Sequence, residues 1–225
     1  MTVGLVVVSH STKLAEGVAE LARQMAPDVA VLPAGGLPDG GIGTDYDSVL
    51  AAAGEADSGD GVVLLYDLGS AQMTAELVVE SLAAPEKAVV VDAPLVEGAV
   101  AAAVTAQGGA DRERVAESAT AAGAPPDLES TPAVLGADAD KRIEVTLRNE
   151  VGLHARPAAL LARSVAGLDA EVRVRLGEEE ADAASVLALM SLGARQGDQI
   201  EIRVRGEQAD EAVERINALV ERDFE

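Results

Sequence analysis

The sequence contains two histidines, and both occupy the same kind of local setting. His10 follows the apolar run LVVV and precedes STKLAEG, while His154 lies between NEVGL and ARPAALLA. Each falls where an expected strand ends and an expected helix begins. A helix N-terminus presents unpaired N–H groups and a positive dipole end, which disfavour imidazolium and favour a bound anion. A neutral imidazole there could accept a phosphoryl group, and a capping or packing role stays open for each histidine.

The residues next to each histidine narrow the possible chemistry. Arg156 could reach phosphoryl oxygens held at His154, or it is an ordinary solvated arginine, and Pro157 suits the first turn of a helix. Ser9 adjoins His10, but adjacent strand residues point to opposite faces, so the two do not form a nucleophile and base pair. Phosphoryl chemistry at the imidazoles is therefore favoured over hydrolysis by a serine.

Composition excludes several other functions. The 225 residues carry a formal charge of −22 and an aromatic share of 1%, which argue against nucleic-acid and membrane-surface binding. The absence of cysteine excludes disulfides and thiolate chemistry. No lysine stands in a phosphate-loop motif, and two separated histidines do not make a zinc site. We therefore expect no metal and no cofactor. Because no targeting or membrane-spanning segment is recognisable, we expect a cytoplasmic protein.

The elements that must position the histidines fall into two halves. Residues 123–140 are dense in Ala, Pro, Gly and Asp and are typical of a linker, which separates domains at 1–122 and 141–225. In the first half, nearly continuous apolar strands alternate with helices, which predicts an α/β fold with a doubly wound, mostly parallel sheet. The predicted strands are 5–8, 29–32, 62–66 and 88–91, and the predicted helices are 12–25, 45–57, 70–83 and 95–106.

The second half has a different periodicity. Its strands, as in EVRVRL and QIEIRVR, alternate apolar and charged residues, which is typical of a sheet with one wet face. We expect a small α+β open-faced sandwich. The predicted strands are 143–147, 171–176 and 199–205, and the predicted helices are 155–166, 185–192 and 208–222.

The second half resembles HPr, the histidine phosphocarrier of the phosphoenolpyruvate:sugar phosphotransferase system. The resemblance rests on GLHARPAALLA and ASVLALMSLGARQGDQIEI and covers residues 141–225. It implies that His154 is the phosphoacceptor and Arg156 stabilises the phosphoryl group. Ser185 falls at a serine that some bacteria phosphorylate for regulation; we favour the alternative that it caps the helix beginning at 186.

The first half resembles mannose-type enzyme IIA domains, and more closely the DhaM family of dihydroxyacetone kinase phosphotransferase subunits. The matching segments are LVVVSHSTKLAEGVAELA, GIGTD, YDLGSA and APLVEGAVAAA. The resemblance implies that His10 carries a phosphoryl group and that Asp67 supports its imidazole, rather than only starting a turn.

Residues near Asp67 could hold the phosphoryl oxygens. Gly69 and Ser70 follow Asp67 at the start of a predicted helix, where their backbone N–H groups could cradle an anion. Gly43 and Thr44 could line the same phosphoryl-binding site from a neighbouring loop. The alternative for the glycines is that their loops are simply turns.

Together the two resemblances imply a phosphoryl relay from phosphoenolpyruvate and enzyme I to His154, then His10, then a nucleotide diphosphate in a dihydroxyacetone kinase subunit. The resemblance also implies a homodimer through the IIA-like domain. The longest family members carry a further enzyme I-like domain, so we expect this chain to receive phosphate from a separate enzyme I. The alternatives are an IIA-HPr carrier for a mannose-type sugar permease and a phosphorylation-dependent regulatory module.

Overall fold

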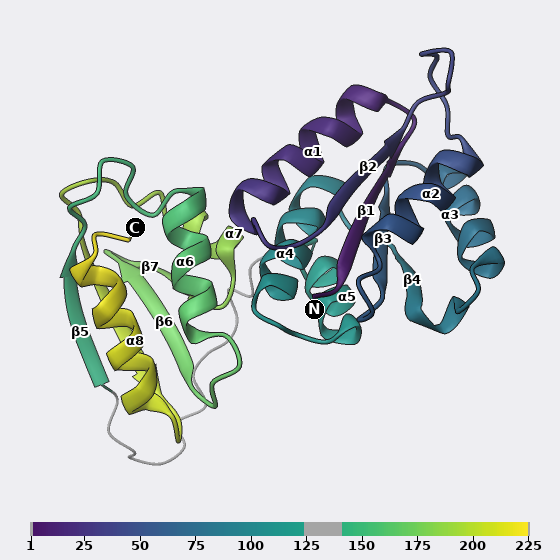
Figure 1. Ribbon diagram of the computed structural model, residues 1–225. Helices are drawn as coiled ribbons and strands as arrows, with labels where there is room; N and C mark the ends of the chain where they lie inside the picture. The colour runs from purple at the N-terminus through teal and green to yellow at the C-terminus, as the bar shows by residue number, and fades with distance from the viewer. Residues whose placement is uncertain (1, 124–140, 225) are drawn as a thin grey trace. The chain divides into compact units, whose positions relative to one another are not determined.

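The computed structural model describes residues 2–123 and 141–224. The chain divides into two compact units, one within residues 1–124 and one within 125–225 (Figure 1). The predicted linker lies outside the described residues, apart from Gly123.

The N-terminal unit is built on a parallel sheet of four strands in the order β2-β1-β3-β4. The strands are β1 (Gly4–Ser9), β2 (Val31–Gly35), β3 (Val62–Tyr66) and β4 (Ala88–Val91). The helices are α1 (Thr12–Met25), α2 (Tyr46–Ala56), α3 (Gly69–Ser81), α4 (Leu95–Gln107) and α5 (Arg112–Ala121), with a 3-10 turn at Pro85–Lys87.

Helices cover both faces of this sheet. Helices α1, α4 and α5 pack on one face, and α2 and α3 pack on the other (Figure 1). Because successive strand side chains alternate between faces, Leu5 and Val7 enter the first core, while Val6 and Val8 enter the second. All four are fully buried, which explains the continuous apolar run. The predicted doubly wound α/β fold is confirmed.

The boundaries of β2 differ from the prediction. The strand was expected at 29–32, before Pro33, but it spans Val31–Gly35 and includes the proline. Strand β2 lies at the edge of the sheet and pairs only with β1. Proline is tolerated in an edge strand because it lacks an N–H group for only one possible neighbour.

Helix α5 was not predicted from the sequence. Asp111 caps it by accepting a hydrogen bond from the N–H of Arg114. Its buried residues are Val115 and Ala119, one turn apart, and the rest of its surface is charged or small. An apolar face of two residues is too short to stand out as a helical period, so tertiary packing on the sheet decides this helix.

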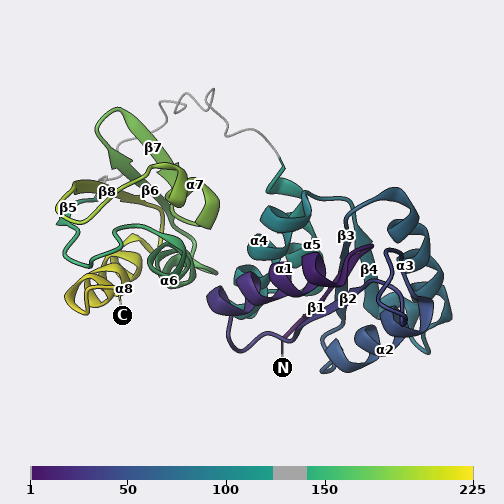
Figure 2. The same cartoon turned by 90° about the horizontal axis from the view of Figure 1, so that it is seen from above.

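The C-terminal unit is an antiparallel sheet of four strands in the order β5-β8-β6-β7. The strands are β5 (Lys141–Thr146), β6 (Glu171–Leu176), β7 (Glu179–Asp182) and β8 (Gln199–Arg205), and the helices are α6 (Ala155–Val165), α7 (Val186–Ser191) and α8 (Ala209–Glu221). The helices lie on one side of the sheet (Figure 2). The open-faced α+β sandwich is confirmed.

Alternation in the strands separates the two faces of this sheet. Val174, Ile200 and Ile202 are fully buried beneath the helices, whereas the residues next to them in each strand, such as Arg173, Arg175 and Glu201, are polar. Strand β7 was not predicted, because its sequence EEAD has little strand propensity. Pairing with β6 places Ala181 opposite Val174 and buries it, so the partner strand rather than local sequence forms β7.

The uncovered face of this sheet carries an ion-pair network centred on Glu171. Both Nε and Nη2 of Arg205 donate to the Glu171 carboxylate, at 2.7 and 2.8 Å, and Arg173 Nε donates to it at 3.0 Å. The hydrogen bond from Arg205 is the largest effect on the Glu171 pKa and, together with Arg173, outweighs burial and lowers it to about 2. The carboxylate therefore stays ionised down to strongly acidic pH.

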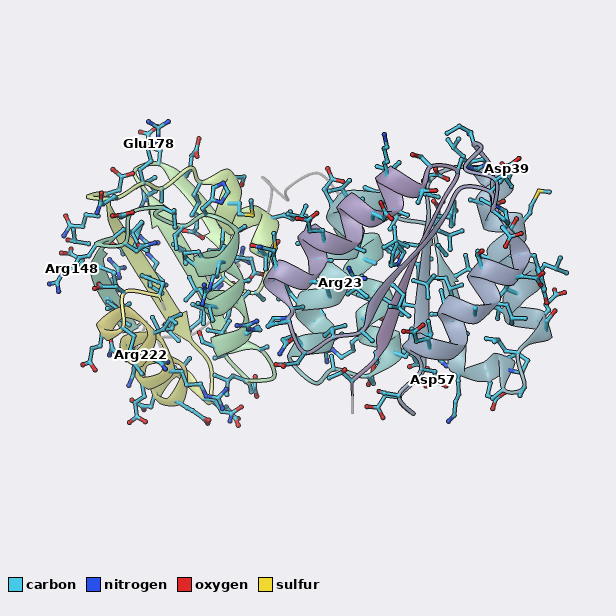
Figure 3. All side chains as sticks on the ribbon, turned by 45° about the horizontal axis from the view of Figure 1, so that its top comes forward. Arg23, Asp39, Asp57, Arg148, Glu178 and Arg222 are labelled. Atoms are coloured by element: carbon cyan, nitrogen blue, oxygen red, sulfur yellow. The ribbon has the colours of Figure 1, made fainter. Side chains whose placement is uncertain are left out.

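Replacing Glu171 by glutamine should destabilise the C-terminal unit by about 1 kcal/mol at neutral pH, a small value because solvent screens a partly exposed pair. The folded-state pKa lies below the ordinary value of 4.5, so this stabilisation is present above about pH 4.5 and is lost as the pH falls toward 2. Urea unfolding followed through β6 and β8 amide resonances measures it. Glu178→Gln, in the exposed turn before β7 (Figure 3), is the matched control. A Glu171→Gln loss independent of pH would contradict the prediction.

Candidate phosphoryl-transfer sites

His10 and Asp67 meet at the carboxyl edge of the parallel sheet. Strands β1 and β3 are hydrogen-bonded neighbours with Val8 opposite Tyr66, so the residues that follow them emerge side by side. His10 Nδ1 lies 2.9 Å from Asp67 Oδ1, and the backbone N–H of His10 donates to Asp67 Oδ2 at 2.9 Å. Ligand sites of open α/β sheets occupy this edge.

The Asp67 carboxylate accepts hydrogen bonds on both oxygens. Oδ1 accepts from His10 Nδ1 and from the N–H of Leu68 at 2.8 Å. Oδ2 accepts from the N–H of His10 and from the hydroxyl of Ser9 at 2.8 Å. Burial raises the pKa of Asp67, but the hydrogen bonds from His10 and Ser9 outweigh it and hold the pKa below its ordinary value. The group is therefore an ionised carboxylate that only accepts.

This carboxylate determines the tautomer of His10. Since ionised Asp67 has no proton to give, Nδ1 must carry the ring proton, and Nε2 keeps its lone pair. Nε2 lies 2.6 Å from Ser70 Oγ, so the hydroxyl donates to Nε2. The exposed nitrogen of His10 is thus a nucleophile with a hydroxyl group directly in front of it.

The N-terminus of α3 lies beside this nitrogen. Helix α3 begins at Gly69, and Leu68 at its cap position provides no side-chain hydrogen bond. The backbone N–H groups of Gly69 and Ser70, in the first turn, have no hydrogen-bond acceptor within the helix. A phosphoryl group on Nε2 would face these donors and the positive end of the helix dipole.

Gly43 and Thr44 belong to a loop that reaches His10, but the Gly43 N–H and the Thr44 hydroxyl are directed away from Nε2. The N–H of Gly43 donates to the backbone carbonyl of His10 at 2.9 Å. Thr44 Oγ1 lies 3.0 Å from Thr74 Oγ1, and the single proton of Thr74 goes to the Ser70 carbonyl, so Thr44 donates to Thr74. The Gly43 N–H and the Thr44 hydroxyl therefore bond to the His10 carbonyl and the Thr74 hydroxyl, and neither is directed at Nε2.

Gly43 is at a position that requires glycine. Its φ is +156°, and an added Cβ would lie 2.9 Å from the Leu37 side chain. The loop from Leu37 to Gly43, with Asp39 at its exposed tip (Figure 3), is closed by hydrogen bonds between Leu37 and Gly41 and between Gly40 and Leu37. The loop therefore has a defined conformation that brings Gly43 to His10.

His154 begins α6 in the C-terminal unit. It occupies the N-cap position with an extended backbone, its side chain makes no capping hydrogen bond, and it is exposed. Arg156 is exposed in the first turn, and Pro157 is buried. The imidazole and the guanidinium are thus both open to a partner at the N-terminus of the same helix.

The backbone before His154 is held by contacts that sequence reasoning missed. Gly152 has a φ of +62°, and a Cβ there would lie 2.1 Å from the Ala194 carbonyl oxygen. Asn149 Nδ2 donates to the Gly152 carbonyl at 2.7 Å, and the N–H of Leu153 donates to Ala194. The Asn-x-x-Gly spacing before His154 is the sequence signal that could have indicated this turn.

Ser185 caps α7, as the capping alternative requires. Its hydroxyl accepts a hydrogen bond from the N–H of Ala188 at 3.2 Å.

Exposed aliphatic side chains lie on the segments that carry the His10 site. Ile42 adjoins Gly43 in its loop, Leu68 adjoins Asp67, and Met73 lies on α3 one turn after Gly69. They are 75%, 60% and 67% exposed, respectively. Such side chains are suited to contact a protein partner.

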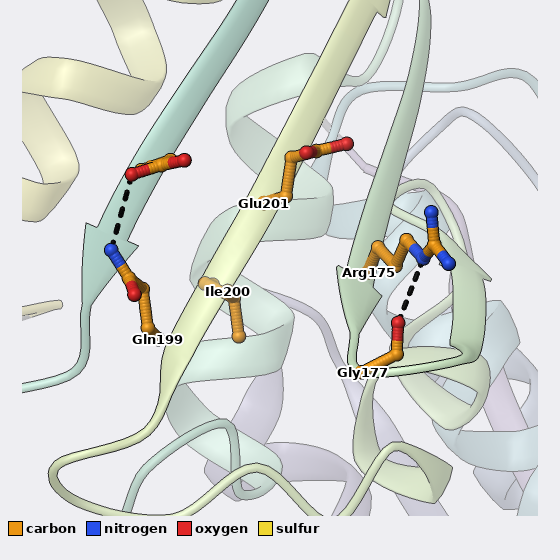
Figure 4. Close-up of a pocket in the computed structure, with 6 residues that line it drawn as sticks. Arg175, Gly177, Gln199, Ile200 and Glu201 are labelled. Carbon is orange, nitrogen blue, oxygen red and sulfur yellow. Dashed lines mark hydrogen bonds between the residues drawn. The ribbon is translucent and has the colours of Figure 1, made fainter.

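A hollow on the uncovered sheet face of the C-terminal unit contains none of the candidate site residues (Figure 4). Its polar groups are bonded to one another, as Gln199 donates to Glu144 at 3.2 Å and Arg175 donates to the Gly177 carbonyl at 2.8 Å.

Within residues 2–123 and 141–224, no three acidic or histidine side chains gather as a metal site. No helix in the described part of the chain is long and apolar enough to span a bilayer.

Comparison with protein families identifies both halves. The model of the family described as "PTS system fructose IIA component" matches residues 4–116, and that described as "PTS HPr component phosphorylation site" matches residues 141–222. The chain combines a IIA-type domain and an HPr-type domain of the phosphotransferase system.

Individual relatives indicate which family of phosphotransferase-system proteins the chain belongs to. A DhaM phosphoryl donor subunit of PEP-dependent dihydroxyacetone kinase from Providencia stuartii is 34% identical over 99% of this chain, which spans 50% of that relative's length. A DhaM subunit from Listeria innocua is 42% identical over 46% of this chain and 82% of its own. The solved structure of EF1359, a protein titled as of unknown function, has a TM-score of 0.50 and 35% identity, covering 56% of this chain and 98% of its own. The chain belongs to the DhaM family.

Proposed function

We propose that this protein relays phosphoryl groups from phosphoenolpyruvate, through enzyme I, to His154, then to His10, and finally to a nucleotide diphosphate. The observation that carries the proposal is the arrangement at His10: Nδ1 is bonded to Asp67, and Nε2 faces Ser70 at the start of α3. The nucleotide is ADP held in a dihydroxyacetone kinase partner, because related DhaM proteins are named as phosphoryl donors of such kinases.

Transfer to His10 is an in-line displacement at phosphorus. The lone pair of Nε2 forms the new N–P bond while the N–P bond at His154 breaks and the His154 imidazole recovers its electron pair. The Nδ1 proton stays on His10, so the phosphorylated ring is positively charged, and ionised Asp67 balances that charge. In the next step, an oxygen of the terminal phosphate of ADP attacks phosphorus, and His10 regains its lone pair.

A phosphoryl group on His154 would be held by a different set of hydrogen-bond donors. The backbone N–H groups at the start of α6 and the guanidinium of Arg156 would hold the phosphoryl oxygens. No carboxylate bonds to the His154 ring among the described residues, unlike at His10. The phosphoryl group on His154 thus lacks a paired counter-charge for its ring, which favours onward transfer to His10.

Ser70 is proposed to exchange partners during transfer. Its hydroxyl donates to Nε2 in the unphosphorylated protein and would turn to a phosphoryl oxygen once Nε2 is occupied. Ser70→Ala should slow transfer from His154 to His10 about 10-fold, the value of one hydrogen bond to a charged group. Rapid-quench labelling measures the rate. Ser81→Ala, which removes a hydroxyl bonded to the Leu77 carbonyl at the other end of α3, is the control; equal rates in the two variants would refute the role of Ser70.

We also propose that the N-terminal unit forms a homodimer. Strand β4 is an edge strand, and Ala88, Val89 and Val90 are only partly buried although all are apolar. An apolar edge strand favours pairing with another copy. Sedimentation equilibrium of the full chain should give twice the monomer mass, and a monomer at all concentrations would contradict the proposal.

Reconstitution tests the proposed function directly. The purified chain is mixed with enzyme I, phosphoenolpyruvate, dihydroxyacetone and the nucleotide-binding and substrate-binding subunits of a dihydroxyacetone kinase. Formation of dihydroxyacetone phosphate that depends on His10 supports the proposal. Phosphorylation of both histidines without any product would exclude the kinase as acceptor and leave a permease or a control protein as the partner.

A further inference from the structure

Ser9 has a buried hydroxyl beside the His10 site, and the proposed relay assigns no role to it. Among the described residues it is the sole polar side chain that is fully buried, with an exposed fraction of 0%. Its hydroxyl donates to Asp67 Oδ2 at 2.8 Å and accepts the N–H of Ser11 at 3.0 Å. The first contact connects the end of β1 to the His10 site, and the second connects it to the start of α1.

The contact with Asp67 constrains a torsion that is otherwise soft. Rotation of an aspartate carboxylate about its terminal bond has broad minima, so hydrogen bonds must fix its plane. Ser9 and the His10 N–H fix Oδ2, and this leaves Oδ1 directed at His10 Nδ1. The side-chain hydroxyl is the one donor of the four that can be removed without changing the backbone or His10.

Adjacent residues within a strand point to opposite faces, which would keep the side chains of Ser9 and His10 apart. That alternation ends at Ser9. Strand β1 ends at Ser9, so His10 lies beyond the last paired residue and its ring is free to turn toward the same carboxylate. Ser9 approaches Oδ2 and the His10 ring approaches Oδ1. Neighbouring residues thus act on one group without contacting each other through their side chains.

We propose that Ser9 is a positioning residue that fixes the Asp67 carboxylate and, through it, keeps the proton of His10 on Nδ1 and the lone pair on Nε2. The kinetic part of this inference rests on the proposed relay, whereas the tautomer part does not. A purely structural role would be to satisfy the N–H of Ser11 at the start of α1, and that role would leave the His10 ring unchanged.

The test compares Ser9→Ala with Ser11→Ala in the full chain. The Ser11 hydroxyl accepts from the N–H of Leu14 at 3.3 Å and caps α1, with no contact to Asp67. The two variants therefore remove a hydroxyl two residues apart at the same helix start. Ser9→Thr, which restores a hydroxyl at a strand position that suits a β-branched residue, is the rescue.

Two readouts are measured. Ring ¹⁵N chemical shifts of His10 should show the Nδ1–H tautomer in the native chain and in Ser11→Ala, and a larger Nε2–H fraction in Ser9→Ala. The rate of phosphoryl transfer from His154 to His10 should fall about 10-fold in Ser9→Ala, as for other groups that orient a reacting imidazole, with labelling of His154 unchanged. Ser9→Thr should restore both values toward those of the native chain.

The outcomes separate this inference from the proposed function. Equal ring shifts and equal transfer rates in Ser9→Ala and Ser11→Ala would overturn the role of Ser9 even if the relay operates. A native chain that never phosphorylates His10 would overturn the relay, and a tautomer change confined to Ser9→Ala would still support the positioning of His10 by Ser9.

Discussion

Replacing His154 by alanine should abolish phosphorylation of both histidines when enzyme I and labelled phosphoenolpyruvate are the only other components. The reason is the order of the proposed relay, in which the HPr-type domain is the one that enzyme I charges and His10 receives its phosphoryl group only from His154. Because His154 is exposed and makes no capping hydrogen bond, the alanine variant should fold normally. Labelling is measured after separating fragments that contain each histidine, under alkaline conditions that preserve phosphohistidine.

His10→Ala is the reciprocal variant. It should retain full labelling of His154 but fail to support formation of dihydroxyacetone phosphate. Mixing the two variants tests whether transfer occurs between chains, since His154 of one chain can then charge His10 of the other. Label on His10 in His154→Ala alone would refute the proposed order.

Replacing Asp67 by asparagine should slow transfer from His154 to His10 on the order of 100-fold or more, as expected when a catalytic imidazole loses the carboxylate that orients it. Each oxygen of Asp67 faces two donors. An amide nitrogen at either position would therefore meet donors, and at the Oδ1 position it would favour the Nε2–H tautomer, which has no lone pair for phosphorus. The variant also lacks the negative charge that balances the phosphorylated ring.

The measurement is single-turnover transfer from charged His154 to His10 in the full chain. Charging of His154 by enzyme I should be unchanged, because Asp67 acts in the other unit. Asp111→Asn, which alters the carboxylate cap of α5 in the same unit, controls for general loss of stability. A transfer rate in Asp67→Asn close to that of Asp111→Asn would show that the carboxylate does not act on His10.

Much of the fold could be predicted because its elements have strong local signals. The apolar runs at β1 and β3 are long enough to indicate strands buried on both faces, and alternation in β6 and β8 indicates a sheet with one wet face. Helix α5 and strand β7 could not be predicted in this way. Each has one or two buried side chains, so the free energy that forms it comes from contacts with distant segments.

The roles of Gly43 and Thr44 illustrate the same limit at the site. The sequence analysis predicted that they line the phosphoryl-binding site, and the structure does bring their loop to His10. Their donors nevertheless point to the His10 carbonyl and to Thr74. Which acceptor a donor finds depends on the loop conformation, and that depends on the φ of Gly43 and on the absence of a side chain there, since a Cβ would lie 2.9 Å from Leu37.

The sequence by itself determined which residue types stand at the two strand-helix junctions, the mostly parallel sheet of one half and the open-faced sandwich of the other, and the family resemblance of each. Those features are local, since they depend on residue identity and periodicity within one segment. Only the tertiary structure decided that Nδ1 of His10 faces Asp67 while Nε2 accepts from Ser70, and that Ser9 reaches Asp67. These contacts join residues 57 to 60 positions apart, and their geometry is set by the pairing of β1 with β3, which no local pattern specifies.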